Sequence, residues 1–239
     1  MIYAISDLHG LPLDTLKQLL KKVNFSDKDW LYILGDVIDR NNGGGVEILL
    51  WLLEQPNVQL ILGNHEAMLL SCDFVFEEIT TESIESFTQE KMEFLLTYTQ
   101  NGGDVTLTAL KNLMKTDPYA VGDILDYLRD APLYETVSAG DNDFLLVHSG
   151  LGNFEKAKKI SSYTADDLLW TRPDINEVYF DNVITVFGHT PTIYYGDIYN
   201  GKIIRTKTWI NIDVGISSGN SPVLLRLDDL KEFKLNSIK

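Results

Sequence analysis

Residues 2–10, Ile-Tyr-Ala-Ile-Ser-Asp-Leu-His-Gly, join a short apolar run directly to an Asp-x-His motif. The same arrangement recurs twice further along the chain. Residues 30–40 read Trp-Leu-Tyr-Ile-Leu-Gly-Asp-Val-Ile-Asp-Arg, and residues 58–66 read Val-Gln-Leu-Ile-Leu-Gly-Asn-His-Glu. Short apolar runs bounded by Gly, Asp and Asn are typical of buried strands. The sequence therefore predicts three strands, each ending at side chains that can bind a metal ion.

Two helices are expected between these strands. Pro12 opens an amphipathic stretch whose apolar residues are spaced for one helix face, namely Leu13, Leu16, Leu19, Leu20 and Val23. A second helix is expected from Val46 to Leu53, after the glycine loop 43–45. Alternating strands and helices are typical of βαβ units with parallel strands, and ligands bind beyond the carboxyl ends of such strands. The three motifs are therefore expected at one edge of a sheet.

The pattern changes between about residue 67 and residue 130, where helical spacing with many acidic residues replaces strand-like runs. We expect a helical cap inserted between two halves of the fold, with a solvated helical flank as the alternative. Asn101-Gly102-Gly103 and Asp117-Pro118 are the expected breaks within it. Strands are expected again at 133–137, 144–147, 183–187, 202–206, 209–212 and 223–227, and the first two are expected to pair as a hairpin joined around Gly140-Asp141. Without a repeat or linker, the sequence predicts a single α/β domain over residues 1–239.

Each of the four histidines lies in a short motif at the end of an expected strand. His9 and His65 belong to the first and third motifs above, His148 begins His-Ser-Gly, and His189 lies in Gly-His-Thr. Histidine and oxygen ligands together suit borderline divalent metals, and the motifs contain no cysteine, which excludes a thiolate site. The pattern therefore predicts a metal centre rather than four packing histidines.

The spacing of the motifs indicates how this centre would be assembled. Alternate residues of an extended segment share a face, so Asp7 and His9 can bind one ion together. Asp36 follows Asp7 by 29 positions (36 − 7) and precedes Asn64 by 28 (64 − 36), and each gap fits one helix plus one strand. A carboxylate such as Asp36 can bridge two ions, as in centres that serve in-line attack at phosphorus. The two histidines from the second half of the chain would complete the second ion.

Composition and charge limit the classes of partner. With 44% hydrophobic and 23% charged residues, the chain is ordinary for a soluble globular protein. Its formal net charge of −15 repels polyanions and argues against nucleic-acid binding, although bound cations would still admit a small phosphorylated substrate. We find no apolar leader and no run long enough for a membrane span. The single cysteine, Cys72, suits a reducing compartment, so a cytoplasmic protein is expected.

The order of the motifs resembles that of the phosphoprotein phosphatase family of calcineurin-like metallophosphoesterases. The family pattern is Gly-Asp-x-His-Gly, Gly-Asp-x-x-Asp-Arg-Gly, Gly-Asn-His-Glu, a His-Gly-Gly-like segment and a final Gly-His. The likeness covers about residues 2–220 and is greatest to the bacteriophage lambda and bacterial serine/threonine phosphatases, which share Asn-Gly-Gly (here 101–103) and Trp-x-Arg (here 170–172). It implies a four-layer α/β/β/α sandwich, in which two mixed β-sheets are flanked by helices.

The resemblance also implies roles for individual residues. One metal ion would be held by Asp7, His9 and Asp36, and the other by Asp36, Asn64, His148 and His189. These ions would be divalent, with manganese expected and iron, zinc, cobalt or nickel compatible with the ligands. A water activated between them would attack phosphorus in line.

The remaining roles implied by the resemblance concern protons and phosphate. His65 would be the general acid, with Asp39 fixing its tautomer. Arg40 and Arg172 would bind phosphate oxygens, where a guanidinium matches the geometry, and Asn64 would also contact the substrate. The sequence departs from the family pattern at Ser6, which replaces glycine, at Asn41-Asn42-Gly43 after Arg40, and at His148-Ser149-Gly150. Asparagine tolerates left-handed backbone, so the turn after Arg40 can persist.

Protein serine/threonine phosphatase activity, with phosphotyrosine as a further substrate, is the function that the resemblance implies. The partner would be a phosphoprotein or phosphopeptide, and no particular oligomeric state is predicted. Related nucleases carry Gly-His-x-His where this chain has Gly188-His189-Thr190. A symmetrical dinucleoside tetraphosphatase is the alternative, although that branch tends to carry Gly-Asn-His-Asp rather than the motif ending in Glu66. A non-catalytic phosphoprotein-binding relative is a further alternative, which turnover of p-nitrophenyl phosphate with manganese would exclude.

Overall fold

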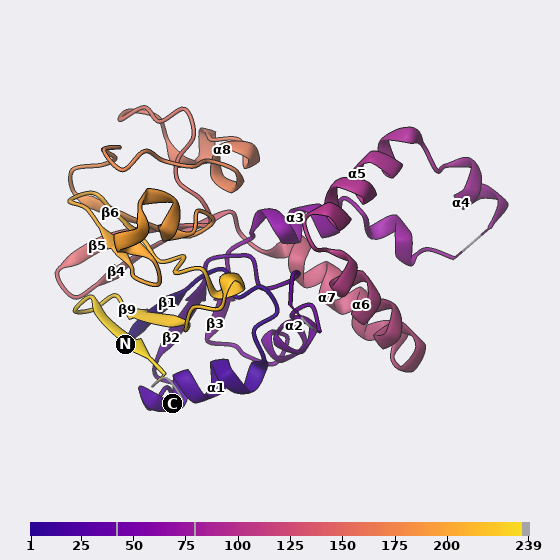
Figure 1. Cartoon of the computed structure of the whole chain (residues 1–239), viewed down its shortest axis with the longest axis horizontal. Helices are drawn as coiled ribbons and strands as arrows, with labels where there is room; N and C mark the ends of the chain where they lie inside the picture. The colour runs from indigo at the N-terminus through magenta and orange to yellow at the C-terminus, as the bar shows by residue number, and fades with distance from the viewer. Residues whose placement is uncertain (42, 79, 236–239) are drawn as a thin grey trace.

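The first of two sheets contains the three predicted N-terminal strands. A computed structural model describes residues 1–41, 43–78 and 80–235. In it, β1 (Ile2–Ile5), β2 (Trp30–Ile33) and β3 (Val58–Leu60) run parallel, as predicted. β9 (Val223–Arg226) pairs antiparallel with β1, and β10 (Lys231–Lys234) forms the outer edge, which gives the order β10-β9-β1-β2-β3 (Figure 1). The sequence did not predict β10, because its charged residues lack an apolar run.

The second sheet comes from the C-terminal half of the chain. Its order is β4-β5-β6-β8-β7, built from β4 (Tyr134–Ala139), β5 (Asn142–Val147), β6 (Val183–Phe187), β7 (Ile204–Arg205) and β8 (Trp209–Asn211). β4 and β5 form the predicted antiparallel hairpin, whereas β6 runs parallel to both β5 and β8. β7 is only two residues long, shorter than the predicted strand at 202–206. Both sheets are therefore mixed, as the fold class requires.

Alternating side chains divide the interior into three layers of packing. In β1, Ala4 faces a core between the two sheets, while Tyr3 and Ile5 face helices on the other side. In β5, Phe144 and Leu146 join the same core between the sheets. Their neighbours in β5 face outward and pack around Trp209 beside α8 (Ala165–Leu169). The predicted α/β/β/α sandwich is confirmed.

The helices cover the first sheet and extend beyond it. α1 (Leu13–Lys22) and α2 (Val46–Leu52) follow the first two motifs, as predicted. Between β3 and β4 lies a helical segment made of α3 (Asn64–Leu70), α4 (Thr81–Glu85), α5 (Gln89–Gln100), α6 (Asp104–Thr116) and α7 (Pro118–Asp130). This helical segment begins at residue 64 rather than 67, so the Asn-His-Glu motif forms the first turn of α3.

Parts of the helical segment lie against the sheets and parts project away from them. α6 and α7 contact α2, and α3 contacts α5 and α7. In Figure 1, α4 and the start of α5 extend outward from the body of the molecule. Within the part of the chain that the structure describes, no helix is long and apolar enough to cross a membrane. Asn42, which belongs to the departure after Arg40, lies outside the described residues.

Candidate metal centre and active site

The loops that follow β1, β2, β5 and β6, together with the first turn of α3, converge on one buried cluster. All six predicted metal ligands lie there, and none is more than 7% exposed. They are Asp7, His9, Asp36, Asn64, His148 and His189. Because buried polar groups are costly unless they have partners, this concentration of acids and histidines requires a chemical explanation.

The backbone at this cluster is held in an unfavourable conformation. Nine residues other than glycine have positive φ among those described, and six of them belong to the predicted site. The six are Asp7, His9, Asp36, Asp39, Arg40 and His189. Left-handed backbone costs energy for residues with a Cβ, and such strain is concentrated at functional sites. We therefore infer that the strained turns after the strands serve to place these side chains in the cluster.

One group of ligands lies at the ends of β1 and β2. His9 Nε2 is 3.6 Å from Asp36 Oδ2 and 4.0 Å from Asp7 Oδ1. The other ring nitrogen, His9 Nδ1, lies 3.1 Å from the Ile38 carbonyl oxygen and donates to it. With the proton on Nδ1, the Nε2 lone pair faces the two carboxylates, which is the orientation of a metal-binding histidine.

A second group of ligands contains the two histidines of the second sheet. Asn64 Oδ1 lies 2.9 Å from His148 Nε2 and 2.9 Å from His189 Nδ1. His148 Nε2 is also 3.4 Å from Asp36 Oδ1, whereas Asp36 Oδ2 faces the first group. His148 Nδ1 donates to the Leu34 carbonyl oxygen at 2.7 Å, so His148 Nε2 directs a lone pair at the Asn64 oxygen. The lone pairs of His148 Nε2 and Asn64 Oδ1 repel each other at this distance. A cation bound by both atoms would replace this repulsion with coordination.

The electrostatics of the cluster also fit bound cations. Burial raises the pKa of the Asp7 and Asp36 carboxyl groups well above their usual values, and repulsion among buried acids adds to the effect. Burial also lowers the pKa of His148 to about 3 and that of His189 to about 2, which keeps both rings neutral. Neutral imidazoles and unpaired carboxylates in low dielectric form the donor set of a divalent metal site. Asp36 belongs to both groups, consistent with a bridging ligand.

The predicted acid is hydrogen-bonded at both of its ring nitrogens. His65 Nδ1 donates to Asp39 Oδ2 at 2.6 Å, and both side chains are buried. His65 Nε2 lies 3.0 Å from Arg40 Nη2 and accepts from this guanidinium. Nε2 is also 3.9 Å from Asp36 Oδ2, and His9, Asp36 and His65 lie close enough together to hold one ion, so the assignment of His65 as the acid rather than a ligand stays a prediction. The contact with the carboxylate favours the tautomer with the proton on Nδ1, and the role of this pair in catalysis stays a prediction.

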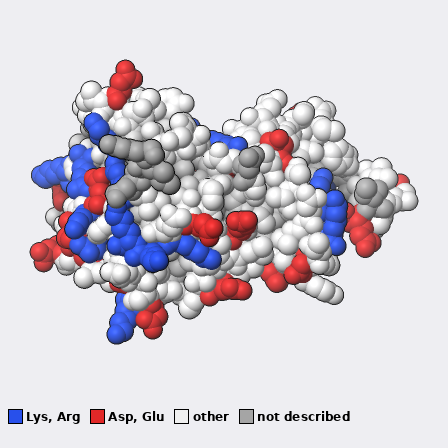
Figure 2. All heavy atoms as spheres, turned by 60° about the horizontal axis from the view of Figure 1, so that its bottom comes forward, with Lys and Arg blue, Asp and Glu red and all other residues white. Residues whose placement is uncertain are grey.

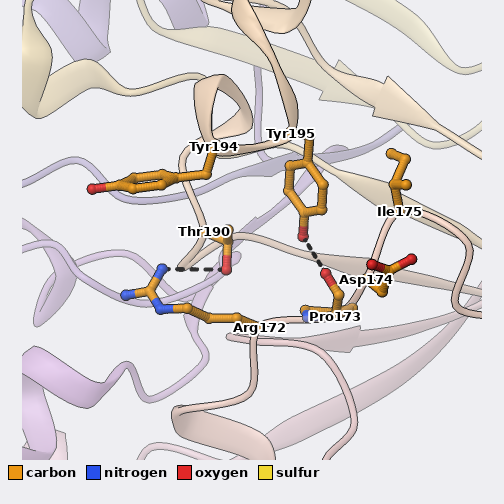
Figure 3. Close-up of a pocket in the computed structure, with 7 residues that line it drawn as sticks. All are labelled: Arg172, Pro173, Asp174, Ile175, Thr190, Tyr194 and Tyr195. Carbon is orange, nitrogen blue, oxygen red and sulfur yellow. Dashed lines mark hydrogen bonds between the residues drawn. The ribbon is translucent and has the colours of Figure 1, made fainter.

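The two arginines lie on different sides of the centre. Arg40 Nη1 is 3.5 Å from Ser217 Oγ, a long contact that leaves the guanidinium free to engage another partner. Arg172 Nη1 lies 3.3 Å from the His189 carbonyl oxygen and 3.4 Å from Thr190 Oγ1 (Figure 3). The Arg40 guanidinium thus lies beside the predicted acid His65, and that of Arg172 lies beside the predicted ligand His189.

Four residues that the sequence did not assign to the site complete its surroundings. Glu66 accepts from the backbone N–H groups of Asp36 at 2.9 Å and Val37 at 2.8 Å, so it shapes the loop that carries Asp36. Its position inside the third motif was a signal for this role. Three further residues gave no such signal: Tyr98, Thr106 and the buried Asp213.

The profile of calcineurin-like phosphoesterases matches residues 1–217. The chain belongs to this family. The family normally binds divalent metals, and the described residues include two His/Asp groups that could hold an ion. The narrower resemblance to the phosphoprotein phosphatases is not specifically supported by this match.

Among curated relatives, two symmetrical bis(5'-nucleosyl)-tetraphosphatases illustrate the similarity. The protein of Actinobacillus succinogenes is 30% identical over 151 residues, covering 62% of this chain and 44% of that protein. The protein of Acidovorax sp. strain JS42 is 24% identical over 210 residues, covering 85% of this chain and 62% of that protein. The chain thus spans less than two thirds of the length of these relatives.

Solved structures share the fold at low sequence identity. A candidate diadenosine tetraphosphatase superposes with a TM-score of 0.62 and 18% identity, covering 98% of this chain and 92% of the other. A protein serine/threonine phosphatase from Saccharomyces cerevisiae gives a TM-score of 0.55 and 14% identity, covering 100% of this chain and 81% of the other. At such identities the likeness supports the fold alone.

Proposed function

We propose that this chain hydrolyses dinucleoside tetraphosphates symmetrically, in a reaction that depends on divalent metal. The observation that carries the proposal is a pair of hollows lined by aromatic side chains, one lined by Trp170 and the other by Arg172, both of which contact His189. A dinucleoside tetraphosphate has a flat base at each end and phosphates between them. Two aromatic hollows next to one metal centre match that chemistry, and the curated relatives point to the same substrate class.

The first hollow has a volume of about 660 Å³ and opens beside Arg172 (Figure 3). Tyr194 and Tyr195 line one side of it, and Tyr194 is 77% exposed. The Arg172 guanidinium lies 6.0 Å from the centre of the Tyr194 ring. An exposed ring next to an arginine suits a base stacked on the tyrosine while a phosphate contacts the guanidinium.

The second hollow, of about 370 Å³, lies between α3, α5 and α8. Phe94 and Trp170 line it, and both are 44% exposed. Trp170 packs edge-on against the His189 ring, with 6.1 Å between ring centres. Volumes of this order hold drug-sized ligands, and exposed aromatic rings contribute stacking energy on binding. The second base of a dinucleotide would occupy this hollow.

The acidic net charge does not conflict with a polyanionic substrate. On the face shown in Figure 2, Lys and Arg side chains gather over the end of the molecule that carries the sheets. At the centre itself, two bound divalent cations would add four positive charges locally to the two that Arg40 and Arg172 carry. Local charge rather than net charge decides binding at such short range.

In this proposal each part of the site has a chemical task. Two divalent cations, manganese by our expectation, would be held by the six ligands and would supply Lewis-acid activation of water and phosphate. Arg172 and Arg40 bind phosphate oxygens. Because Arg40 donates to His65 Nε2, that nitrogen becomes available to the leaving oxygen once Arg40 has moved onto the phosphate. His65 Nε2, which holds a lone pair while Nδ1–H donates to Asp39, then takes up a proton from solvent, and the resulting imidazolium donates this Nε2 proton to the leaving oxygen.

Protein phosphatase activity is the second candidate. Two sequence features favour it, Glu66 and the segment 101–103, and the structure shows both in contact with residues around the centre. Glu66 binds the loop of Asp36, and Gly102 accepts from the Arg40 backbone N–H at 3.1 Å. The open hollows could also hold apolar residues of a phosphopeptide. Only the substrate distinguishes the two candidates.

The test is a side-by-side assay after metal reconstitution. Diadenosine tetraphosphate, a phosphoserine peptide and a phosphotyrosine peptide are incubated separately with the manganese-loaded protein, and the products are separated by chromatography. We expect the dinucleotide to yield ADP alone, with a kcat/KM well above those for the peptides. ATP plus AMP would contradict symmetrical attack. Faster turnover of the phosphoserine peptide would favour the second candidate.

Matched variants connect the result to the hollows. Trp170→Ala and Tyr194→Ala should each raise KM for the dinucleotide about tenfold or more, because stacking on one base contributes roughly 1–3 kcal/mol. Neither should change KM for p-nitrophenyl phosphate to the same extent. Tyr119→Ala is the control, since this tyrosine is 83% exposed on α7 and lines neither hollow.

A further inference from the structure

We infer that Tyr98 and Thr106, both from the helical segment, are positioning residues for the general acid. Their hydroxyl groups donate hydrogen bonds to the Asp39 carboxylate, which in turn orients His65. The inference rests on the proposed hydrolase function, because it assigns to His65 the task of proton donation. It adds a role for the helices inserted between β3 and β4.

The contacts of Asp39 carry the inference. Its Oδ2 accepts from His65 Nδ1 at 2.6 Å. Its Oδ1 accepts from the Tyr98 hydroxyl at 2.8 Å and from Thr106 Oγ1 at 2.6 Å. Tyr98, Thr106 and Asp39 have no exposed surface. A buried carboxylate must be fully hydrogen-bonded to remain charged, and the two hydroxyls supply what His65 alone cannot.

Thr106 also binds the backbone of the loop that carries Asp39. The Asp39 backbone N–H donates to Thr106 Oγ1 at 3.0 Å, while the threonine hydroxyl donates its single proton to the carboxylate. One side chain therefore fixes both the backbone and the carboxylate of Asp39. This matters because Asp39 has a φ of 75°, a strained value that surrounding contacts must maintain.

Two glycines make room for this arrangement. A Cβ at Gly103 would fall on the Tyr98 ring, and a Cβ at Gly44 would lie 2.6 Å from Thr106 Oγ1. The backbone at these positions can approach the two hydroxyl residues only because it lacks a side chain. The glycines after residue 101 thus allow α5 and α6 to pack directly behind Asp39. The helical segment therefore contacts Asp39 directly, through one hydroxyl from α5 and one from α6.

Burial and the neighbouring Asp39 carboxylate raise the pKa of the Tyr98 hydroxyl, which therefore stays protonated and acts as a donor. Without the two hydroxyls, the carboxylate would lose two of its three hydrogen-bond partners and rotate away from His65. The imidazole would then lose its fixed tautomer and orientation. The expected defect is in proton donation, so it grows as the leaving group becomes a stronger base.

The experiment uses Tyr98→Phe, Thr106→Val and the double variant of the full-length, manganese-loaded protein. The first readout is kcat on phenyl phosphate and on p-nitrophenyl phosphate, whose leaving phenolates differ in basicity. A general acid contributes about 10²–10⁴ in rate, so we expect losses of about tenfold or more on phenyl phosphate and smaller losses on the nitro ester. KM and metal content should be unchanged, and Thr106→Ser should restore activity.

The second readout does not require turnover. The proton on His65 Nδ1, in its short bond to Asp39, should give a far-downfield proton resonance in protein loaded with zinc, which is diamagnetic, in place of manganese, and the resonance is assigned by its absence in His65→Asn. We expect the resonance to weaken or shift in Tyr98→Phe and Thr106→Val. Thr108→Val and Tyr119→Phe are controls, because Thr108 Oγ1 bonds only within α6 and Tyr119 is exposed.

The outcomes separate this inference from the proposed function. Equal rate losses on both esters, or a resonance unchanged in both variants, would overturn the positioning role. If the wild-type protein hydrolysed no phosphoester, the proposed function would fail, while the resonance would still decide whether the hydroxyls hold the Asp39–His65 pair. Parallel changes in the resonance and in the leaving-group dependence would support both.

Discussion

Individual acidic residues explain why the centre needs cations. Asp213 is buried, and its Oδ1 accepts from the Gly215 backbone N–H at 2.9 Å. Burial raises the pKa of Asp213 to about 7, and this carboxylate in turn raises the pKa of Asp7. Without metal, folding at neutral pH forces several like charges into low dielectric. The buried acids therefore lower the folding stability of the metal-free protein, as functional sites commonly do.

Asp213→Asn should stabilise the metal-free protein in a pH-dependent manner. The carboxyl titrates near 3.9 in the unfolded chain and near 7 in the folded one, so its cost grows as pH rises between these values. Asparagine keeps the acceptor for Gly215 but carries no charge. Thermal melts in chelator should show a higher Tm for the variant at pH 8 and a smaller difference at pH 5. The same difference at both pH values would argue against the charge as its cause.

Residues differ in how far the sequence could predict them. The six ligands and His65 were predicted because each lies in a short motif directly after a strand. Tyr98 and Thr106 contact Asp39 from 59 and 67 positions away, with no local pattern to mark them. Asp213 follows β8 without a histidine or glycine motif of the kind that marked the others. Contacts that depend on how helices pack cannot be read from spacing along one strand.

Junctions between strands and loops are the elements on which the centre depends most. β6 ends at Phe187, and the next residue, Gly188, passes directly over the first motif. A Cβ at Gly188 would fall on Ser6 Oγ and Asp7 Oδ2. The Ser6 hydroxyl donates to the same Asp7 oxygen. The glycine before His189 is therefore needed for close approach between the two sheets, rather than for its backbone angle.

Gly188→Ala should weaken metal binding and destabilise the protein, because Asp7 must move to admit the methyl group. Overpacking of this kind typically costs about 1–3 kcal/mol. Gly122→Ala is the control: the position is open space on α7, and alanine there should be neutral or stabilising by up to about 1 kcal/mol. Tm and manganese titration measure both effects. Wild-type metal affinity in Gly188→Ala would contradict the packing account.

Whole elements were predicted most reliably where hydrophobic pattern and end signals agreed. The parallel strands, the hairpin and the helical character of residues 67–130 are all confirmed by the structure. β10 escaped prediction because its sequence, Lys-Glu-Phe-Lys, buries little and pairs only at an edge. β7 was predicted too long, since apolar residues near a sheet edge need not join the ladder. The extent of β7 and β10 therefore depends on pairing with neighbouring strands rather than on local sequence.

In the molecule as a whole, the two sheets bring the carboxyl ends of their parallel strands to a common site. The first sheet supplies the loops of Asp7 and Asp36, and the second supplies those of His148 and His189. The helical segment packs behind this site and contacts it through hydrogen bonds to the Asp39 carboxylate. The predicted ligands of the second ion come from both halves of the chain, so the two-metal centre is complete only when both sheets have packed against each other.

The central claim is that the six ligands form one two-metal centre with Asp36 as its bridge. The most direct measurement is elemental analysis of protein that has been stripped with chelator, reloaded with manganese and desalted. The wild-type chain and the exposed control Asp123→Asn should retain two ions per chain, whereas Asp36→Asn should retain fewer than one and lose hydrolysis. Two ions per chain in Asp36→Asn, with unchanged activity, would contradict the account.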